Sequence, residues 1–388
     1  MSEWKEYKLG EIADVQTGPF GSQLHQSDYV DVGIPSIMPV NIGDRMNIST
    51  EKIVYITEED AVRLSRYRVQ NGDIVYSRRG DVEKCAYINE DEAGWLCGTG
   101  CLRIRIDSTQ ADSKFVAYYL STEDMKSWIS NNAVGTTMPN LNSSILQQVP
   151  LSLPSLDEQK RIASILCSLD DKIDLLNREN ATLEAMAETL FRQWFIEDAK
   201  EDWEEKPLSS IATFLNGLAC QKYPPKNEIE KLPVLKIREL TNGIGADSDW
   251  ATTDVGEEYI VQSGDVIFAW SASLMVKIWD GEDCILNQHL FKVTSTTYPK
   301  WFYYLWCKHH LNEFIAIAQS HATTMGHIKR NDLDTAMVLV PSPDELKILS
   351  ETMEPIFSKL KNNNYQLVSL RTQRDILLPK LMSNEIEL

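Results

Sequence analysis

The sequence feature that most constrains the fold is a long heptad pattern that occurs twice. The first copy begins at Pro154, and its apolar positions follow alternating spacings of four and three residues. The seam positions are Ile162, Leu166, Leu169, Ile173, Leu176, Asn180, Leu183, Ala187, Leu190 and Trp194. A seam of this length, flanked by charged residues, is typical of a coiled-coil helix. One amphipathic surface helix would explain the first copy but not its repetition.

The second copy begins at Pro341 and repeats the seam at a constant offset in the sequence. Its positions are Leu349, Met353, Ile356, Leu360, Asn363, Leu367, Leu370, Arg374, Leu377 and Leu381. An antiparallel alignment with full overlap places Asn180 opposite Asn363, where two amides can hydrogen-bond to each other and fix the register. The sequence therefore predicts an intramolecular antiparallel coiled coil with an Asn180–Asn363 layer.

Two residues of the second copy work against this pattern. Arg374 would lie opposite Leu169 in the seam, where an apolar side chain is expected. Pro379 lacks a backbone N–H, so we expect it to kink or end the second helix.

The segments that precede the two helices are also duplicated. The residues Trp4, Leu9, Ile12 and Ala13 return as Trp203, Leu208, Ile211 and Ala212. Short apolar runs after turn residues predict strands, and each segment adds one aromatic-rich helix, KFVAYYLSTEDMKSWI or KWFYYLWCKHHLNEFI. We therefore predict an α/β (α+β) fold with two pseudo-repeated domains separated by two long helices that form the coiled coil. The expected parts are residues 1–153, 154–200, 201–341 and 342–388.

Composition excludes several classes of protein. No long apolar run is present, so we expect a soluble, cytoplasmic chain without a membrane partner. Seven cysteines at irregular spacings argue against a disulfide framework and a zinc site, and favour buried, inert thiols. No phosphate-binding glycine loop or nucleophile motif occurs, and the six histidines do not cluster in the sequence. We therefore assign no catalytic residue, no metal ligand and no cofactor to this chain.

Several loops carry residues that suit DNA. In the first module, Ser77, Arg78 and Arg79 directly follow a strand, with Lys84 shortly after. Arginine can donate two hydrogen bonds to guanine or to a phosphate. The corresponding loop of the second module offers Trp270, Ser271, Ser273 and Lys277, so two similar scaffolds carry different side chains. An equally simple interpretation is a solvated turn with ordinary surface residues.

Weaker candidates complete the set of DNA-binding residues. Lys236 and Arg238 are one strand period apart and are expected to share a face. The pairs Thr136-Thr137 and Thr323-Thr324 would offer hydroxyl groups to phosphates, or act only as helix caps. Ser22 and Gln23 lie in a further polar loop. Because the net charge is −19 and evenly spread, a partner would have to supply much of the attraction for phosphates.

Taken together, the sequence resembles the specificity (S) subunits of type I restriction–modification systems. The resemblance rests on LPSLDEQKRIASIL after a strand, on helix ends LFRQWF and LLPKLMSNEI, on NGDIVYSRRG and SGDVIFAW, and on the half-chain repeat. It implies that each module is a target recognition domain for one half of an asymmetric, bipartite site in double-stranded DNA. It also implies that the paired helices set the spacer and bind two methyltransferase subunits.

The same resemblance places the chemistry in partner subunits. The methyltransferase subunits would bind S-adenosylmethionine and modify adenine, and restriction subunits would use ATP and Mg²⁺ to drive cleavage. Two alternatives remain open at this stage. One is a coiled-coil scaffold or adaptor that binds protein and not DNA, and the other is a specificity subunit of a different restriction type whose partner fuses methyltransferase and nuclease.

Overall fold

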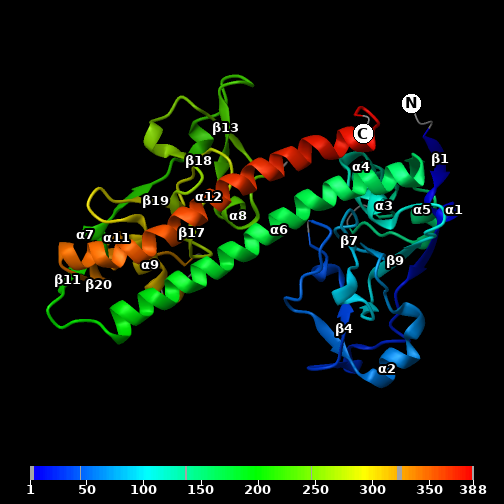
Figure 1. The fold of residues 1–388 in the computed structure, drawn as a ribbon, viewed down its shortest axis with the longest axis horizontal. Coiled ribbons are helices and arrows are strands. Elements are labelled where there is room, and N and C mark those ends of the chain that lie inside the picture. Colours follow the sequence, from blue (N-terminus) through cyan, green and yellow to red (C-terminus); the bar gives the residue numbers. More distant parts are fainter. Residues whose placement is uncertain (1–3, 44, 136–137, 246, 321–325, 387–388) are drawn as a thin grey trace. The chain divides into compact units, whose positions relative to one another are not determined.

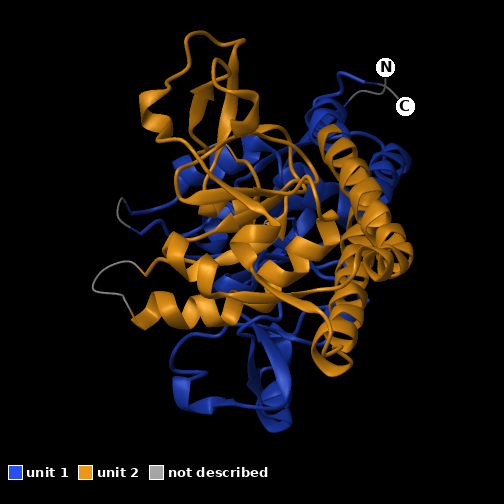
Figure 2. Cartoon of the chain, turned by 90° about the vertical axis from the view of Figure 1, so that its left-hand side faces the viewer, with its two compact units in different colours: residues 1–170, 373–388 blue, residues 171–372 orange. Residues whose placement is uncertain are grey.

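The computed structural model describes residues 4–43, 45–135, 138–245, 247–320 and 326–386. The chain divides into two compact units, shown in different colours in Figure 2. Unit 1 comprises residues 1–170 and 373–388, and unit 2 comprises residues 171–372. Each unit therefore combines one of the two duplicated modules with parts of both long helices. The long helices are α6 (Leu156–Arg192) and α12 (Pro343–Met382), and each continues from one unit into the other (Figure 1).

The strands of unit 1 form a main sheet, a second sheet and a separate strand pair. They are β1 (Lys5–Lys8), β2 (Ala13–Thr17), β3 (Tyr29–Val30), β4 (Ile34–Ile37), β5 (Val54–Ile56), β6 (Ile74–Ser77), β7 (Cys85–Tyr87), β8 (Leu96–Cys97), β9 (Cys101–Ile106) and β10 (Pro150–Leu153). The main sheet has the antiparallel order β2-β9-β6-β7. The second sheet has the order β3-β5-β4-β8, and its strands β4 and β8 are parallel. The strand pair joins β1 to β10.

Unit 2 repeats this arrangement. Its strands are β11 (Glu204–Pro207), β12 (Thr213–Asn216), β13 (Lys231–Leu235), β14 (Trp250–Thr252), β15 (Ile260–Val261), β16 (Val266–Ala269), β17 (Met275–Ile278), β18 (Cys284–Leu286), β19 (Leu290–Thr294) and β20 (Met337–Val340). The main sheet has the order β12-β19-β16-β17, and β11 pairs with β20. The second sheet again has one parallel pair, β13 with β18. Helices and mixed sheets in both units confirm the predicted fold class.

The aromatic-rich segments differ from the sequence prediction, because each forms two helices and not one. They are α3 (Ser113–Leu120), α4 (Glu123–Asn132), α9 (Lys300–His309) and α10 (Leu311–Ser320). Between α3 and α4, the hydroxyl groups of Ser121 and Thr122 donate to the carbonyls of Tyr118 and Tyr119, both at 2.8 Å. Such local bonds compete with the helical backbone pattern and end the first helix.

Each module shares its hydrophobic core with the long helices. In unit 1, Ile162 and Leu166 of α6 and Leu381 of α12 lie in one buried cluster with Phe115 and Leu151. The equivalent cluster of unit 2 contains Ala187, Phe191, Met353, Trp301 and Val338. Burying one apolar side chain of this size contributes roughly 1.5–3 kcal/mol to the free energy of folding. The helices are therefore part of both cores.

Within unit 2, the two helices pair in the predicted antiparallel register. Ile173, Leu176 and Leu367 form a buried cluster of their own. Next to it, Asn363 Nδ2 donates to Asn180 Oδ1 at 2.9 Å and to Glu179 at 2.9 Å. Asn180 Nδ2 in turn donates to Asn364 Oδ1 at 2.7 Å. The polar layer therefore involves one more asparagine than the heptad pattern indicates.

Arg374 and Pro379 are accommodated near the end of α12. Arg374 Nη1 lies 3.4 Å from Asp170 Oδ1, so the arginine has an acidic partner within unit 1. Of the two outcomes expected at Pro379, an end of the helix is wrong, because α12 runs to Met382. Pro379 is exposed and only one helical hydrogen bond is lost there, whereas continuing the helix buries Leu381 and Met382.

The asparagine layer can be tested by substitution. Asn363→Ala removes the donor to Asn180 Oδ1 from a fully buried position, so the free energy of unfolding should fall by about 1–3 kcal/mol in urea denaturation. Asn362→Ala is the matched control, since Asn362 is exposed and adjacent. Its effect should stay within about 0.5 kcal/mol. Equal unfolding midpoints for the two variants would contradict a structural role for the layer.

Candidate nucleic-acid interface

In unit 1, loops from distant parts of the sequence meet at one edge of the main sheet. The loop after β2 is fixed where Gly18 N donates to Cys101 O at 2.9 Å. The loop after β6 is fixed where Arg78 N donates to Gly100 O at 2.8 Å. The segment before α5 (Ser143–Gln147) joins them, because Leu141 N donates to Arg78 O at 2.9 Å. These backbone bonds hold the loops as one surface.

Unit 2 repeats this edge bond for bond. Gly217 N donates to Leu290 O at 3.1 Å, in the place of the bond made by Gly18. Trp270 N donates to His289 O at 3.3 Å, and Ile328 N donates to Trp270 O at 3.1 Å. The duplicated sequence therefore builds the same backbone frame twice.

The loop that follows the first strand of each main sheet starts with a glycine, because another backbone segment passes very close to it. A Cβ added to Gly18 would lie 2.2 Å from the Gly98 carbonyl, and one added to Gly217 would lie 2.2 Å from the Asn287 carbonyl. Both distances are too short for any side chain, so only glycine fits.

In unit 1 the frame presents two arginines. The Arg78 guanidinium lies over the Phe20 ring at 5.2 Å, a cation–π geometry. Burial, together with the nearby charge of Arg79, lowers the pKa of Arg78 from its ordinary value. Arg79 itself is exposed, and its carbonyl accepts a hydrogen bond from Ser77 Oγ at 3.1 Å. The buried Ser77 therefore stabilises the loop backbone. The positive charge of the loop comes from Arg78 and Arg79.

The remaining candidates of unit 1 have more local roles. The Gln23 side-chain oxygen accepts from Phe20 N at 3.2 Å and from Tyr67 Oη at 2.8 Å, so Gln23 braces the loop that carries Phe20. Ser22 is exposed next to it. Lys84 Nζ lies 3.5 Å from an Asp81 carboxylate oxygen in the connection between β6 and β7.

In unit 2 the same frame presents aromatic and polar groups. Trp270 stacks on Phe291 with ring centroids 5.7 Å apart and donates from Nε1 to Asn216 Oδ1 at 3.0 Å. Ser271 is buried, and its Oγ lies 3.1 Å from His289 Nδ1. These contacts fix the indole ring against the sheet edge. Ser273 is exposed in the same loop.

Sequence reasoning missed the histidines of this edge. His289 and His327 both contact the Trp270 ring, with centroids 5.8 and 6.3 Å away. The six histidines do not cluster in the sequence, but in the folded chain these two both reach the Trp270 ring. They are distant in sequence, and the β-bridge between Ser271 and His327 brings them together. Only the internal repeat could have indicated this contact, since His327 in unit 2 occupies the position of Asn140 in unit 1.

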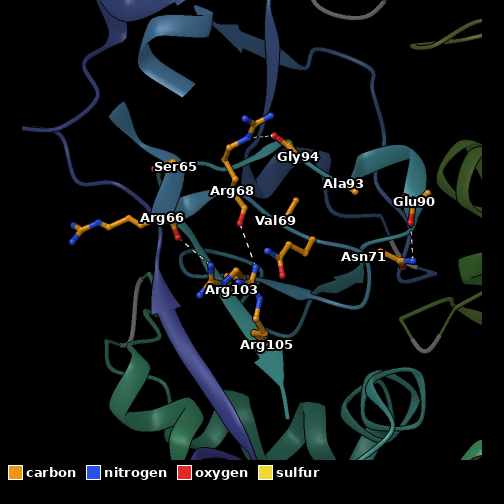
Figure 3. A pocket seen from close by; sticks show the side chains of 11 residues that line it. Ser65, Arg66, Arg68, Val69, Asn71, Glu90, Ala93, Gly94, Arg103 and Arg105 are labelled. Atoms are coloured by element: carbon orange, nitrogen blue, oxygen red, sulfur yellow. Dashed lines mark hydrogen bonds between the residues drawn. The ribbon is translucent and has the colours of Figure 1, made fainter. Parts of the chain in front are cut away.

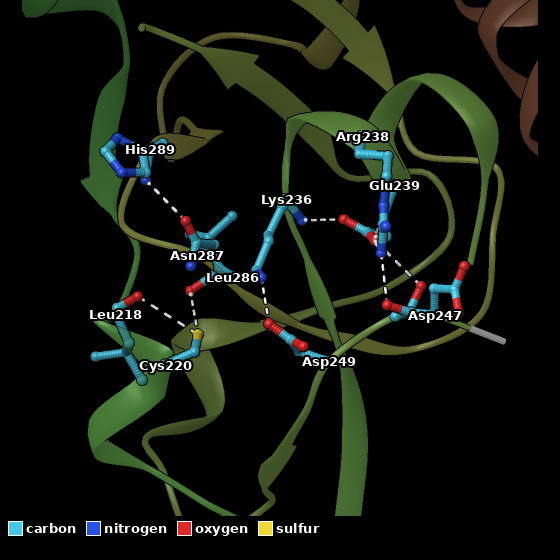
Figure 4. Close-up of polar contacts among 11 residues, drawn as sticks. Leu218, Cys220, Lys236, Arg238, Glu239, Asp247, Asp249, Leu286, Asn287 and His289 are labelled. Atoms are coloured by element: carbon cyan, nitrogen blue, oxygen red, sulfur yellow. Dashed lines mark hydrogen bonds and ion pairs between the residues drawn. The ribbon is translucent and has the colours of Figure 1, made fainter. Parts of the chain in front are cut away.

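The predicted shared face of Lys236 and Arg238 is wrong. Strand β13 ends at Leu235, and Arg238 lies in the helix α8 (Ile237–Asn242). Lys236 Nζ forms an ion pair with Asp249, and Arg238 pairs with Glu239 at 2.7 Å (Figure 4). The hydrogen bond from Lys236 N to Glu239 at 3.3 Å starts the helix.

Lys277 is also engaged within the protein. Its Nζ lies 2.9 Å from an Asp280 carboxylate oxygen and donates to the Leu240 carbonyl at 3.3 Å. The threonine pairs Thr136-Thr137 and Thr323-Thr324 lie outside the described residues. Of the cationic candidates, the structure thus brings Arg78 and Arg79 to the shared edge.

Neither a metal centre nor a membrane span is found in the described part of the chain. No group of three or more histidine, cysteine or acidic side chains there could hold a metal ion. No described helix is long and apolar enough to cross a bilayer. All seven cysteines are free thiols, and only Cys167 is not buried.

Comparisons with known proteins agree with the duplicated architecture. The family described as "Type I restriction modification DNA specificity domain" matches residues 1–185 and 200–370. The type I restriction enzyme MjaIX specificity subunit of Methanocaldococcus jannaschii is 24% identical, over 99% of this chain and 94% of that protein. The HindI specificity subunit of Haemophilus influenzae is 21% identical over the full length of both.

A solved structure shows a similar fold. The crystal structure of the type I restriction-modification S subunit from M. genitalium superposes with a TM-score of 0.60 at 15% identity. The match covers 98% of this chain and 96% of that one.

The buried thiols lead to a chemical prediction. Burial raises the pKa of Cys85 to about 11 and that of Cys97 to about 12, so both stay protonated at pH 8. Because the thiolate is the reactive species, iodoacetamide should modify the native protein at Cys167 alone within minutes. Mass spectrometry should find all seven thiols modified after denaturation. Rapid native labelling of Cys97 would contradict the packing around it.

Proposed function

Because the chain belongs to the family of type I restriction modification DNA specificity domains, we propose that it reads a bipartite DNA site with one module per half-site. The observation that carries this proposal is the repeated edge. Both units fix the same loops with the same backbone hydrogen bonds, but they fill the edge with different side chains. A recognition protein with two unlike half-sites needs one scaffold with two surfaces.

The side chains of each edge suggest how the half-sites differ. In unit 1, Arg79 is exposed and Arg78 is held by Phe20, so both guanidinium groups can donate to guanine or to backbone phosphates. In unit 2, Trp270 offers an apolar surface, and Asn216 and His289 offer hydrogen-bonding groups. We infer a half-site contacted by charge in unit 1, and one contacted by shape and neutral hydrogen bonds in unit 2.

Catalysis is assigned to partner subunits. We propose that two methyltransferase subunits, carrying S-adenosylmethionine, modify adenine and that ATP- and Mg²⁺-dependent restriction subunits cleave unmodified DNA. In this arrangement the present chain contributes recognition and assembly.

The long helices support a role in spacing. Helix α6 has 37 residues and α12 has 40, and both join the two modules without a break. A helix of this length extends roughly 55–60 Å, which corresponds to more than one turn of duplex DNA. We propose that their length sets the unread spacer between the two half-sites.

Replacing Arg78 and Arg79 by alanine should impair recognition of one half-site only. Each lost guanine contact is worth about 1–3 kcal/mol, so affinity for the first half-site should fall at least tenfold. The measurement is a gel shift of the complex on duplexes altered in one half at a time.

Trp270→Ala is the reciprocal control for this experiment, since Trp270 occupies the place of Arg78 in unit 2. This variant should weaken recognition of the second half-site and leave recognition of the first unchanged. Equal losses at both halves for either variant would contradict the assignment of one module to each half.

Lengthening both helices tests the spacing role. One heptad inserted after Leu176 and one after Leu367 preserve the apolar seam and add about 10 Å. The methylated site should then have a spacer roughly three base pairs longer. Genome-wide methylation mapping measures the spacer length directly. An unchanged spacer would refute the proposal that the length of the helices sets it. Insertion into α6 alone is the control, and it should abolish activity by disrupting the register.

A further inference from the structure

The sheet edge of unit 1 that presents the two arginines also carries exposed apolar side chains. Phe20, in the loop after β2, is 51% exposed. In the segment before α5, Val134 and Met138 are each 64% exposed. That segment is joined to the arginine loop, because Gly80 N donates to Pro139 O at 3.2 Å. Single exposed apolar side chains are common on proteins, but three of them around two arginines indicate a surface that a ligand covers.

The Phe20 ring is exposed, yet the loop that carries it is held firmly. Gln23 N and Leu24 N donate to Phe20 O at 2.7 and 3.2 Å. The Gln23 side chain accepts from Phe20 N at 3.2 Å, and Leu24 is buried beneath the loop at 3% exposure. The preceding carbonyl, Pro19 O, accepts from Thr99 Oγ1 at 3.2 Å. An apolar group that is already ordered loses little conformational entropy when a ligand covers it.

The arginine beside this ring has no acidic partner. Elsewhere in unit 1, Arg105 makes two hydrogen bonds to Asp73, at 2.8 and 2.7 Å. Likewise, Arg68 donates to the Gly94 carbonyl at 2.6 Å (Figure 3). Arg78 forms no ion pair with any described residue, and its buried Nε has no described acceptor. Its guanidinium instead lies over the neighbouring aromatic ring, so the face of the cation is covered while its Nη groups can still donate to a ligand.

Unit 2 shows that the fold does not require an aromatic ring at the position of Phe20. Two residues after the glycine that begins the equivalent loop, the chain has Ala219. The aromatic ring at the edge of unit 2 comes from the other loop, as Trp270, which takes the place of Arg78. The same frame is thus built with alanine at this position, and the exposed ring of Phe20 serves a contact outside the fold.

We propose that Phe20 is a specificity-determining residue of the first half-site, and that its ring contacts the C5 methyl group of a thymine. In the major groove this methyl group is the apolar feature of the base edges, whereas guanine presents the two acceptors that an arginine binds. The Arg78 guanidinium lies 5.2 Å from the centre of the Phe20 ring. Because base pairs are about 3.4 Å apart along the duplex, the thymine is expected within about two base pairs of the guanine that Arg78 binds. This inference rests on the proposed reading of one half-site by each module.

Replacing thymidine by deoxyuridine tests the contact, because it removes the methyl group and keeps every hydrogen-bonding group of the base. The assembled complex is titrated in gel shifts with duplexes that carry one replacement at a time. The first half-site is the one whose recognition is impaired when Arg78 and Arg79 are replaced by alanine. One replacement there should weaken binding by the native complex about threefold to tenfold, since a buried methyl group is lost. Replacements in the spacer are the control and should leave the affinity unchanged.

Variants of the chain assign the methyl group to Phe20. Phe20→Ala should bind the thymidine and deoxyuridine duplexes with equal affinity, because the two groups that contact each other are coupled. Val32→Ala is the matched control and should keep the native preference. Val32 is 86% exposed and precedes β4, whose other end, at Ile37, adjoins the edge loops. Phe20→Leu keeps a smaller apolar group and should show an intermediate preference, which provides the measurement if Phe20→Ala does not assemble.

Three results would overturn the inference. They are a first half-site without thymine, no response of the native complex to any replacement in that half-site, and a native preference retained by Phe20→Ala. Each of them leaves the proposed function intact as long as the native complex distinguishes duplexes that are altered in one half. A native complex that binds all duplexes alike would overturn the proposed function and this inference with it.

Discussion

The packing of seam residues into the module cores is the constraint on which the rest of this structure depends. The seam residues Ile162 and Leu166 of α6 belong also to the core of unit 1, and the seam residues Ala187 and Leu190 pack in the core of unit 2. A module cannot shift along its helix without exposing these side chains to water. The burial of apolar surface therefore fixes the loops at the edge of each main sheet relative to the helix segments of the same unit.

The two modules share the same backbone arrangement but carry different side chains on it. Hydrogen bonds such as Arg78 N to Gly100 O and Trp270 N to His289 O involve main-chain atoms only, so they survive a change of side chain. The same is true of the left-handed turn, where Gly80 with φ 76° corresponds to Ala272 with φ 58°. A frame built from backbone bonds leaves the outward side chains free to differ. That freedom is what two unlike half-sites require.

The sequence indicated some features of the candidate interface and missed others. The loop of Arg78 and Arg79 was identified because a strand, a turn and two basic residues follow one another locally. The ion pair of Lys236 with Asp249 was not, since Asp249 comes from another segment of the chain, and the ion pair of Arg238 with Glu239 forms in a helix where the sequence indicated a strand. Likewise, His289 and His327 meet at Trp270 only because the sheet edge folds them together. An exposed cation and a neutralised one look alike in a sequence.

The sequence by itself determined the duplication, the two long helices and their antiparallel register, down to the hydrogen bond between Asn180 and Asn363. Heptad spacing and repeats are local patterns, and the burial of a seam converts them directly into structure. Only the tertiary structure decided which loops share an edge and which charges are already paired. Those features depend on contacts between residues far apart in the chain, and no periodicity of the sequence encodes them.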